Sequence, residues 1–282
     1  MEREEIDRMV DLAVNGDQNA MESLLVEVQD RVFNISLRML GSVSDAEDAS
    51  QDILLRVMTG LPGFRKESSY FTWVYRIAVN YLINYKKSMF AQHPLDFEFY
   101  GRDIETGSLD FHEELYEEPD RELLAEELKL SCTNVMLQCL DPQSRCIFIL
   151  GTMFKLDSRM AGEILDMSPE NYRKKLSRIR KKVGDFLSQY CGLTETGMCS
   201  CRKRVGYAIS QHRINPERLE FGNLKRLDSG ILETVKQEME TMDAASLIFS
   251  NMPEYRISDK AKEFIEKMIG SESMKIIAAN TK

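Results

Sequence analysis

Residues 168–182 limit the possible folds of this chain more than any other segment. They read Ser-Pro-Glu-Asn-Tyr-Arg-Lys-Lys-Leu-Ser-Arg-Ile-Arg-Lys-Lys and contain seven basic residues, although the whole chain has a net charge of −9. Ser168 is a typical N-cap and Pro169 suits the first helical position, so the sequence predicts a helix that starts here. Apolar residues at helical spacing predict one buried face: Tyr172, Leu176, Ile179 and Val183.

A shorter helix is predicted directly before this one. Residues 156–165 have a helical pattern, and Asp166-Met167 reads as a tight turn. A helix, a short turn and a basic helix form the layout of a helix-turn-helix, whose second helix enters the major groove of DNA. A merely solvated charged helix is the alternative, because most charge runs are of that kind. The capping residues and the buried face favour DNA binding.

Composition sets wider limits. A chain of 282 residues suggests about two domains, or two and an extension, and 43% hydrophobic residues suffice for packed cores. Strand patterns are scarce and helical periodicity is nearly continuous, which predicts an all-α fold. No apolar run reaches the ~18 residues of a membrane span, and the charged N-terminus is unlike a signal peptide, so we expect a cytoplasmic protein that does not enter a membrane.

The net charge carries a hint about partners. A protein that bound DNA strongly by itself would usually be basic, since counterion release supplies much of the affinity. An acidic chain with local basic patches fits a subunit whose DNA binding depends on a larger partner.

Composition also divides the chain. We expect a first helical domain at 1–88, an acidic linker with a flexible backbone at 89–120, a second helical domain with the helix-turn-helix at 121–190, and a Cys-containing helical extension at 191–282. Within the first domain, one helix starts at Asp17 and stops at Gly41, and a capping box at 44–47 opens a second that ends at 60–63. A third runs from about Ser69 to Lys87.

Two surfaces of the first domain stand out. In 64–87, aromatic side chains alternate with basic and amide ones, a composition that suits unpaired bases better than duplex DNA. Arg76, Asn80 and Asn84 recur every four residues and so share a helix face. Most of the rings would alternatively be core, and a stripe of Phe71, Val74, Ala78, Leu82 and Tyr85 fits that interpretation. The acidic helix at 45–56 predicts a docking face for a basic partner.

Several ordered motifs resemble one family. Asp-Ala-Glu-Asp-Ala-Ser-Gln-Asp at 45–52, Leu-Pro-Gly-Phe-Arg at 61–65 and Glu-Ser-Ser-Tyr-Phe-Thr-Trp-Val-Tyr-Arg-Ile-Ala-Val-Asn at 67–80 resemble region 2 of the extracytoplasmic-function sigma factors of bacterial RNA polymerase. Residues 140–187 are similar to region 4 of that family, and the acidic linker is similar to its region-three linker. The resemblance covers roughly residues 5–190.

The resemblance implies a promoter-specificity subunit, without enzymatic activity and without a required cofactor, that binds core RNA polymerase and promoter DNA. The clamp of the polymerase would be bound by Asp48, Gln51, Asp52 and Leu55. The melted minus-ten element, with one base flipped, would be bound by Phe64, Arg65, Lys66, Ser69, Tyr70, Trp73, Arg76 and Asn80. The minus-thirty-five element would be read by Asn171, Arg173, Lys174, Lys175 and Arg178.

Three positions depart from the family pattern. Val74 stands where housekeeping members have a second Trp, which implies weaker strand separation. Asp166 replaces the usual turn glycine, and Asp tolerates the left-handed conformation better than most residues. Ala161 and Gly162 stand where Ile and Ala are preferred, which predicts looser packing of the first helix of the motif.

The extension adds a cysteine cluster. Cys191, Cys199 and Cys201 could bind zinc with His212 as fourth ligand, act as redox-responsive thiols, or remain unmetallated. Arg202, Lys203 and Arg204 would favour thiolates. The heptad-spaced Cys132, Cys139 and Cys146 are expected to be buried small hydrophobes.

Two kinds of regulation are open. Residues 191–282 could control the factor in cis through amphipathic helices within 205–282, or an anti-sigma factor could do so. A stand-alone helix-turn-helix regulator with a metal- or redox-sensing module is the alternative function. It leaves the motifs of 45–84 unexplained. An enzyme domain has little support, because no catalytic motif is recognisable.

Overall fold

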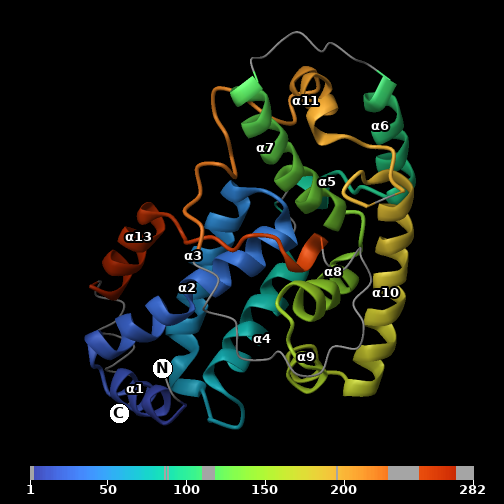
Figure 1. Cartoon of the computed structure of the whole chain (residues 1–282). Coiled ribbons are helices and arrows are strands. Elements are labelled where there is room, and N and C mark those ends of the chain that lie inside the picture. Colours follow the sequence, from blue (N-terminus) through green and yellow to red (C-terminus); the bar gives the residue numbers. More distant parts are fainter. Residues whose placement is uncertain are drawn as a thin grey trace.

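The computed structural model describes residues 3–85, 87, 89–109, 118–194, 196–227 and 248–270. Within these ranges the chain is all-α, and the one extended pairing is an isolated bridge between Arg226 and Tyr255. Helix α10 forms one long side of the molecule, with α11 near one end and α1 at the other (Figure 1). The elements in chain order are α1 (Arg3–Val14), α2 (Gln18–Leu40), α3 (Val43–Gly60), η1 (Leu61–Gly63), α4 (Tyr70–Ile83), α5 (Met89–Gln92), α6 (Phe97–Leu109), α7 (Glu118–Leu137), α8 (Pro142–Phe148), η2 (Ile149–Met153), α9 (Ser158–Ile164), α10 (Pro169–Tyr190), α11 (Cys201–Ser210) and α13 (Asp259–Ile269).

The predicted boundaries of α2 are confirmed. The Asp17 side chain caps the helix by accepting from the backbone N–H of Ala20, and Gly41 ends it in the left-handed region with φ 77°. The next cap differs from the prediction, because Ser42 rather than Ser44 is the N-cap of α3 and accepts from the N–H of Asp45. The capping box was therefore placed two residues too late.

Helix α4 begins where the sequence predicted and ends earlier. Ser69 caps it by accepting from the N–H of Thr72 at 3.1 Å. The helix ends at Ile83, with Asn84 as C-cap, so the prediction of a helix through Lys87 was wrong. Val74, Ala78 and Leu82 are buried, as the apolar stripe indicated, and its two aromatic ends are half-buried.

Helix α6 was not expected from the sequence, which showed two glycines in an acidic segment. Both glycines lie inside the helix and allow tyrosines to come close. A Cβ on Gly101 would lie 2.6 Å from Cζ of Tyr190, and a Cβ on Gly107 would lie 2.5 Å from Cδ1 of Tyr207. Part of the predicted linker is thus a packed helix between α10 and α11.

The helix-turn-helix is present as α9 and α10. Ser168 is the N-cap and Pro169 the first helical residue of α10, as predicted. Asp166 has φ 52°, so the turn keeps the left-handed conformation without a glycine. Gly162 makes the motif tighter, contrary to the expectation of looser packing, because a Cβ there would lie 2.7 Å from the carbonyl oxygen of Met167.

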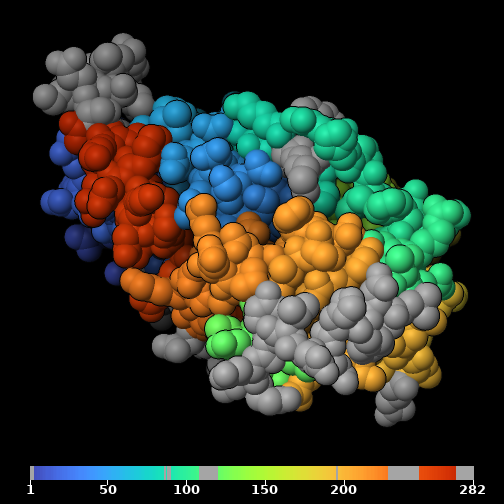
Figure 2. All heavy atoms as spheres, turned by 90° about the horizontal axis from the view of Figure 1, so that it is seen from above, coloured from blue at the N-terminus to red at the C-terminus, as the bar shows by residue number. Residues whose placement is uncertain are grey.

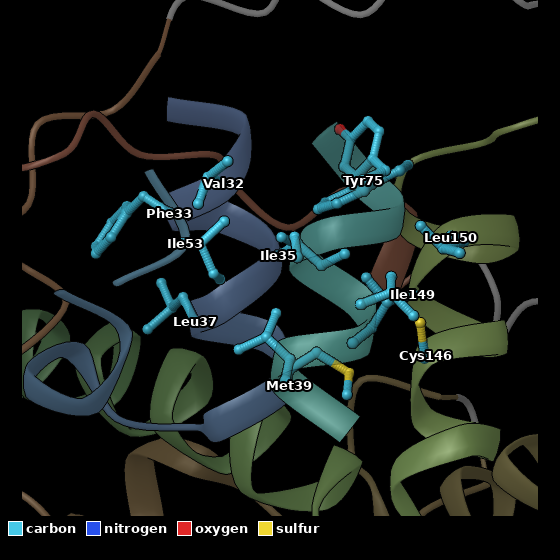
Figure 3. Close-up of a cluster of buried hydrophobic side chains, with 14 of the residues drawn as sticks. Val32, Phe33, Ile35, Leu37, Met39, Ile53, Tyr75, Cys146, Ile149 and Leu150 are labelled. Atoms are coloured by element: carbon cyan, nitrogen blue, oxygen red, sulfur yellow. The ribbon is translucent and has the colours of Figure 1, made fainter. Parts of the chain in front are cut away.

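One continuous hydrophobic core joins both helical domains. It contains α2 and α3 side chains such as Ile35 and Ile53 together with Cys146 of α8 and Leu150 of η2, as Figure 3 shows. Tyr75 of α4 belongs to the same core, and its ring lies 6.3 Å from that of Phe154. The two domains therefore pack directly against each other. A second, smaller cluster joins α7 to α11.

The extension covers the first domain. Seen from above, residues 248–269 lie against α2 and α3, and residues 201–227 lie between that surface and α6 (Figure 2). Helix α13 has the predicted apolar face, with Ala261, Ile265, Met268 and Ile269 buried and Phe264 exposed. Within the stretch 205–282, where amphipathic helices were predicted, residues 221–227 are not in a helix, and residues 231–235 lie outside the described residues.

Candidate nucleic-acid interface and thiol cluster

The acidic face of α3 is open. Asp48, Asp52 and Leu55 are exposed and Gln51 is half-buried, while the opposite face of the helix is in the core. The phenol of Tyr81 on α4 donates a hydrogen bond to Asp52, and burial and this carboxylate raise the pKa of Tyr81. All four residues assigned to polymerase docking thus lie on one side of one helix, with two carboxylates outside the core.

The aromatic residues of the minus-ten group have different surroundings. Phe64 and Tyr70 are buried, and the Tyr70 hydroxyl donates to the carbonyl oxygen of Leu24 at 3.2 Å. Trp73 is half-buried, with its ring 5.1 Å from that of Phe64 and 6.1 Å from that of Tyr70. The first two rings support the third, so Trp73 is the aromatic residue of this group that is best placed for an unpaired base.

The polar residues of the minus-ten group also differ in exposure and in hydrogen-bond partners. Arg65 and Asn80 are exposed and Arg76 is half-buried. Lys66 has φ 58°, and its ammonium group donates to the Asp11 carboxylate at 2.5 Å and to the Asp7 carbonyl oxygen at 3.1 Å. Ser69 is occupied as the α4 cap. In this structure the Lys66 ammonium group is thus occupied by contacts with α1.

The basic charges of α10 divide into two sets. Asn171, Arg173, Lys174 and Arg178 are exposed, and Lys175 is half-buried. Arg173 donates to the Ser158 hydroxyl of α9 at 2.8 Å, and Lys174 forms an exposed pair with Glu170. Arg180 instead donates to the Gly151 carbonyl oxygen and the Thr152 hydroxyl, so it holds η2 against α10. The set at the start of the helix remains accessible to a nucleic acid.

Four cysteines line one cavity. They are Cys132 of α7, Cys191, Cys199 and Cys201, with Ile104, Leu187 and Ile248 among the apolar neighbours. Cys139 and Cys146 are buried as expected, but Cys132 is only half-buried and accepts a hydrogen bond from Tyr100 at 3.0 Å. The prediction is therefore confirmed for Cys139 and Cys146 and only in part for Cys132, which packs against the core and also lines the cavity.

The fourth zinc ligand suggested by the sequence lies elsewhere. His212 is exposed beyond the end of α11, with φ 54°, and it does not line the cavity. Within the described ranges, no group of three or more His, Cys, Asp or Glu residues is arranged to hold a metal ion.

The cavity holds one acidic thiol. The pKa of Cys199 is lowered to about 6, first because Cys201 hydrogen-bonds to it and also because the Arg204 guanidinium is close, which together outweigh burial. The pKa of Cys132 is raised to about 11, mainly by burial. The pKa values of Cys191 and Cys201 are raised as well. Among the four thiols, Cys199 is thus the one whose pKa is lowered.

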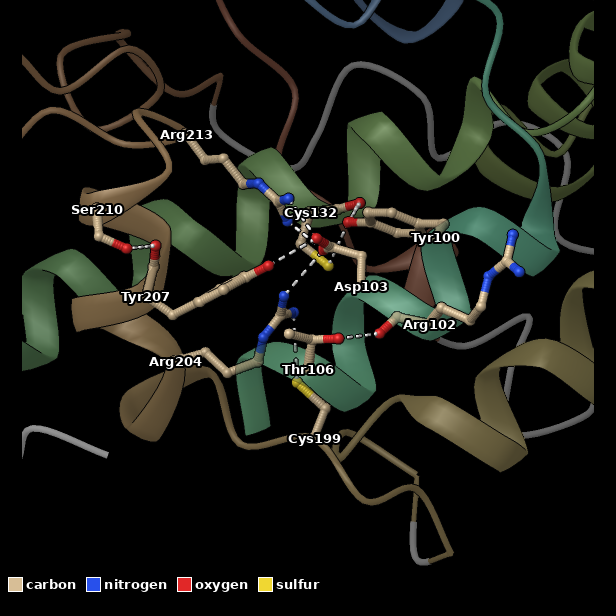
Figure 4. A network of polar contacts seen from close by, with 10 residues as sticks. All are labelled: Tyr100, Arg102, Asp103, Thr106, Cys132, Cys199, Arg204, Tyr207, Ser210 and Arg213. Atoms are coloured by element: carbon tan, nitrogen blue, oxygen red, sulfur yellow. Dashed lines mark hydrogen bonds and ion pairs between the residues drawn. The ribbon is translucent and has the colours of Figure 1, made fainter. Parts of the chain in front are cut away.

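A polar network beside the thiols joins α6 to α11. The Asp103 carboxylate accepts from Arg204 at 3.2 Å, from the Tyr207 hydroxyl at 2.9 Å and from Arg213 (Figure 4). These cations and hydrogen bonds lower the pKa of Asp103 against the effect of burial. Sequence reasoning missed the network. The one feature of the sequence that indicated it was the pair of glycines in α6, because glycines allow a close approach of neighbouring side chains.

Comparison with known proteins agrees with the geometry of α2, α3 and α4. Residues 24–89 match sigma-70 region 2. The chain is 23% identical to the RNA polymerase sigma-H factor of Pseudomonas aeruginosa over 185 residues, which is 66% of this chain and 95% of that protein. It is 26% identical to the ECF RNA polymerase sigma factor SigW of Bacillus subtilis over 178 residues, 61% of this chain and 92% of that protein.

A shorter match has a higher identity. Over 77 residues, 27% of this chain and 40% of the relative, identity to the ECF RNA polymerase sigma-E factor of Escherichia coli K12 reaches 36%. The chain belongs to the sigma-70 family of RNA polymerase sigma factors, in its extracytoplasmic-function group. About a third of the chain lies outside the sigma-H match.

No helix in the described ranges has both the length and the apolarity that a bilayer crossing requires.

Proposed function

We propose that this chain binds core RNA polymerase through α3 and directs it to promoters as a sigma subunit. The observation that carries the proposal is the combination, in one chain, of a region 2 match at 24–89, an exposed carboxylate face on α3 and a helix-turn-helix with exposed cations at its start. The relatives are all named as sigma factors, so a stand-alone regulator is not favoured. The chain acts as a binding subunit rather than as an enzyme, and it works in the cytoplasm.

Each surface then has one role. Asp48, Gln51, Asp52 and Leu55 dock on the polymerase clamp. Trp73 stacks on an unpaired base of the minus-ten element, which is worth about 1–3 kcal/mol. Arg65, Arg76 and Asn80 hold the same strand. Phe64, Ser69 and Tyr70 support that surface from within, and Lys66 joins it when it leaves Asp11. Asn171, Arg173, Lys174, Lys175 and Arg178 enter the major groove at the minus-thirty-five element.

In this structure the two DNA-binding domains are held together, an arrangement that we call the closed state. The segment 249–257, which we name the bridging segment, contacts both domains. The ring of Phe249 packs edge-on at 5.0 Å against Phe148 of α8. At its other end, Ile257 donates its N–H to Asp30 of α2 at 2.9 Å. The bridging segment thus fastens α2 of the first domain to α8 of the second.

Promoter elements some distance apart require the two DNA-binding domains to separate. We therefore propose that the bridging segment inhibits the factor in cis, and that polymerase or a signal displaces it. An anti-sigma partner is the alternative regulator. Zinc bound by Cys191, Cys199 and Cys201 also stays a prediction, but without His212, which does not line their cavity. Metal analysis of the purified chain tests it.

Co-purification with core polymerase tests the main proposal. A chain with Asp48→Ala and Asp52→Ala should lose core binding and run-off transcription together. The matched control removes two exposed acids of α6, Glu98→Ala and Glu105→Ala, and should keep both. If the α3 variant binds core as tightly as the unaltered chain, α3 is not the docking face. If the unaltered chain binds no core at all, the sigma proposal fails.

A further inference from the structure

The backbone presents two thiols to the same cavity. Ser200, between Cys199 and Cys201, is extended with φ −122° and ψ 116°. Side chains two residues apart in an extended segment point to the same side, so both sulfurs lie together. Cys199 and Cys201 both line the cavity. At about 3.3 Å of rise per residue, the two Cα atoms are about 6.6 Å apart. This spacing lies within the range of about 4.4–6.8 Å that a disulfide accepts.

The surroundings suit a reactive thiol. Nη1 of Arg204 lies 3.9 Å from Sγ of Cys199, and the Arg204 side chain is 4% exposed. Its Nε has no hydrogen-bond partner within the described residues, although the other side of the guanidinium is bound to Asp103. A buried donor without an acceptor is costly. An oxygen atom added to the Cys199 sulfur would offer that guanidinium an acceptor.

We propose that Cys199 and Cys201 form a peroxide-sensitive dithiol site. The Cys199 thiolate attacks one oxygen of a hydroperoxide, the O–O bond breaks, and the sulfur becomes a sulfenic acid while the other oxygen leaves as water or alcohol after taking up a proton. The Cys201 sulfur then attacks Cys199, the S–O bond breaks, and the oxygen leaves as water with the proton of the Cys201 thiol. Two thiols lose two electrons, and the peroxide gains them.

Oxidation changes the neighbouring contact. The disulfide removes the negative charge that Arg204 faces on the cavity side, and it ties the first residue of α11 to the preceding loop. Arg204 also binds Asp103 of α6, so the α6–α11 contact feels the change directly. The site does not depend on the sigma proposal, because it requires no polymerase.

The experiment uses the full-length chain, fully reduced and freed of metal by a chelator, with hydrogen peroxide as the probe. Differential alkylation and peptide mass spectrometry should show a Cys199–Cys201 disulfide as the first product. In Cys201→Ser, dimedone should label Cys199 as the trapped sulfenic acid. Cys146→Ser, at a buried position remote from the cavity, should leave the rate unchanged. Arg204→Gln should slow oxidation several-fold.

Hydrogen exchange reports the structural effect. After oxidation of the unaltered chain, backbone amides of 97–109 and 201–210 should exchange faster. In Cys199→Ser, the same peroxide treatment should leave their exchange rates unchanged. Equal oxidation of all six cysteines, a first disulfide between other cysteines, or no dimedone adduct on Cys199 would each overturn the proposal. So would one tightly held zinc per chain that is absent from Cys199→Ser, because the thiol would then be a metal ligand.

Discussion

Asn34 and Tyr255 exchange two hydrogen bonds across 221 positions of sequence. The Asn34 amide donates to the Tyr255 carbonyl oxygen at 2.7 Å, and the Tyr255 N–H donates to the Asn34 side-chain oxygen at 2.9 Å. The side chain thus acts as a strand partner for one residue of the bridging segment. Next to it, Arg38 donates to the carbonyl oxygen of Pro253 and to Asn134 of α7.

Asn34→Ala should destabilise the closed state. Both backbone groups of Tyr255 would be left without their partner in a buried place, at about 1–3 kcal/mol for each. Urea denaturation should show the lower free energy of unfolding. Asn15→Ala is the control, since its side chain makes one exposed bond to the Asp11 carbonyl oxygen and its removal should cost little. Equal stability of the two variants would show that the exchanged pair is weak.

Phe249→Ala tests whether the bridging segment inhibits. Phe249 is 1% exposed against Phe148, and removing such a ring costs about 3–5 kcal/mol. The loss of the ring in Phe249→Ala should release the bridging segment. Run-off transcription at a limiting concentration of the factor should then rise. Phe99→Ala is the control, because Phe99 is 52% exposed on α6. Lower transcription in Phe249→Ala, with core binding also reduced, would mean that the bridging segment helps docking.

The role of the basic residues at the start of α10 can be tested apart from that of the cations further along the helix. Arg173→Ala, Lys174→Ala and Lys175→Ala together should abolish initiation that depends on the minus-thirty-five element and leave core binding intact. Removing each cation that neutralises a phosphate should reduce the slope of log affinity against log salt by about 0.9. Lys181→Ala, which removes a cation paired with Asp185, is the control. A loss of core binding in the triple variant would show that the surfaces are wrongly assigned.

Trp73→Ala should impair strand opening more than initial binding. The indole is half-buried on Phe64, so its truncation removes a stacking surface at moderate cost to the fold. Permanganate reactivity of unpaired thymines measures the opening. Tyr70→Phe, which removes the hydroxyl bonded to Leu24, should affect stability alone. Unchanged permanganate reactivity in Trp73→Ala would make the indole a core residue.

The alkylation rate of Cys199 should depend on pH in a distinctive way. Its pKa is about 6 instead of the ordinary 9.0, so iodoacetamide should react with it at pH 7 and much more slowly below pH 6. Cys132, with a pKa of about 11, should react slowly at pH 7. Since the folded pKa is the lower one, the thiolate stabilises the fold most above pH 9, and this contribution is lost as the pH falls toward 6. A Cys199 midpoint near 9 would contradict the described environment.

Local sequence patterns predicted those parts of the fold that local chemistry determines. Asp17, Ser69 and Ser168 cap helices through side-chain oxygens that accept from the N–H group three residues later, so the adjacent sequence is enough to predict them. The thiol cavity depends on contacts across long sequence distances. Cys132 is 59 positions before Cys191, and its heptad spacing to Cys139 suggested only a buried helix face. Asp103 looked like one acid among many because its three partners come from the extension.

The position of the bridging segment in the chain has a consequence for synthesis. The ribosome makes residues 249–257 after every helix of both DNA-binding domains, at about 5–20 residues per second. Until then Asn34 has no Tyr255 to bind and Phe148 has no Phe249 to cover it. A nascent or prematurely ended chain therefore lacks these contacts. A newly made molecule gains them only after its last third has been synthesised, so the order of synthesis places the assembly of the two DNA-binding domains before the step that joins them.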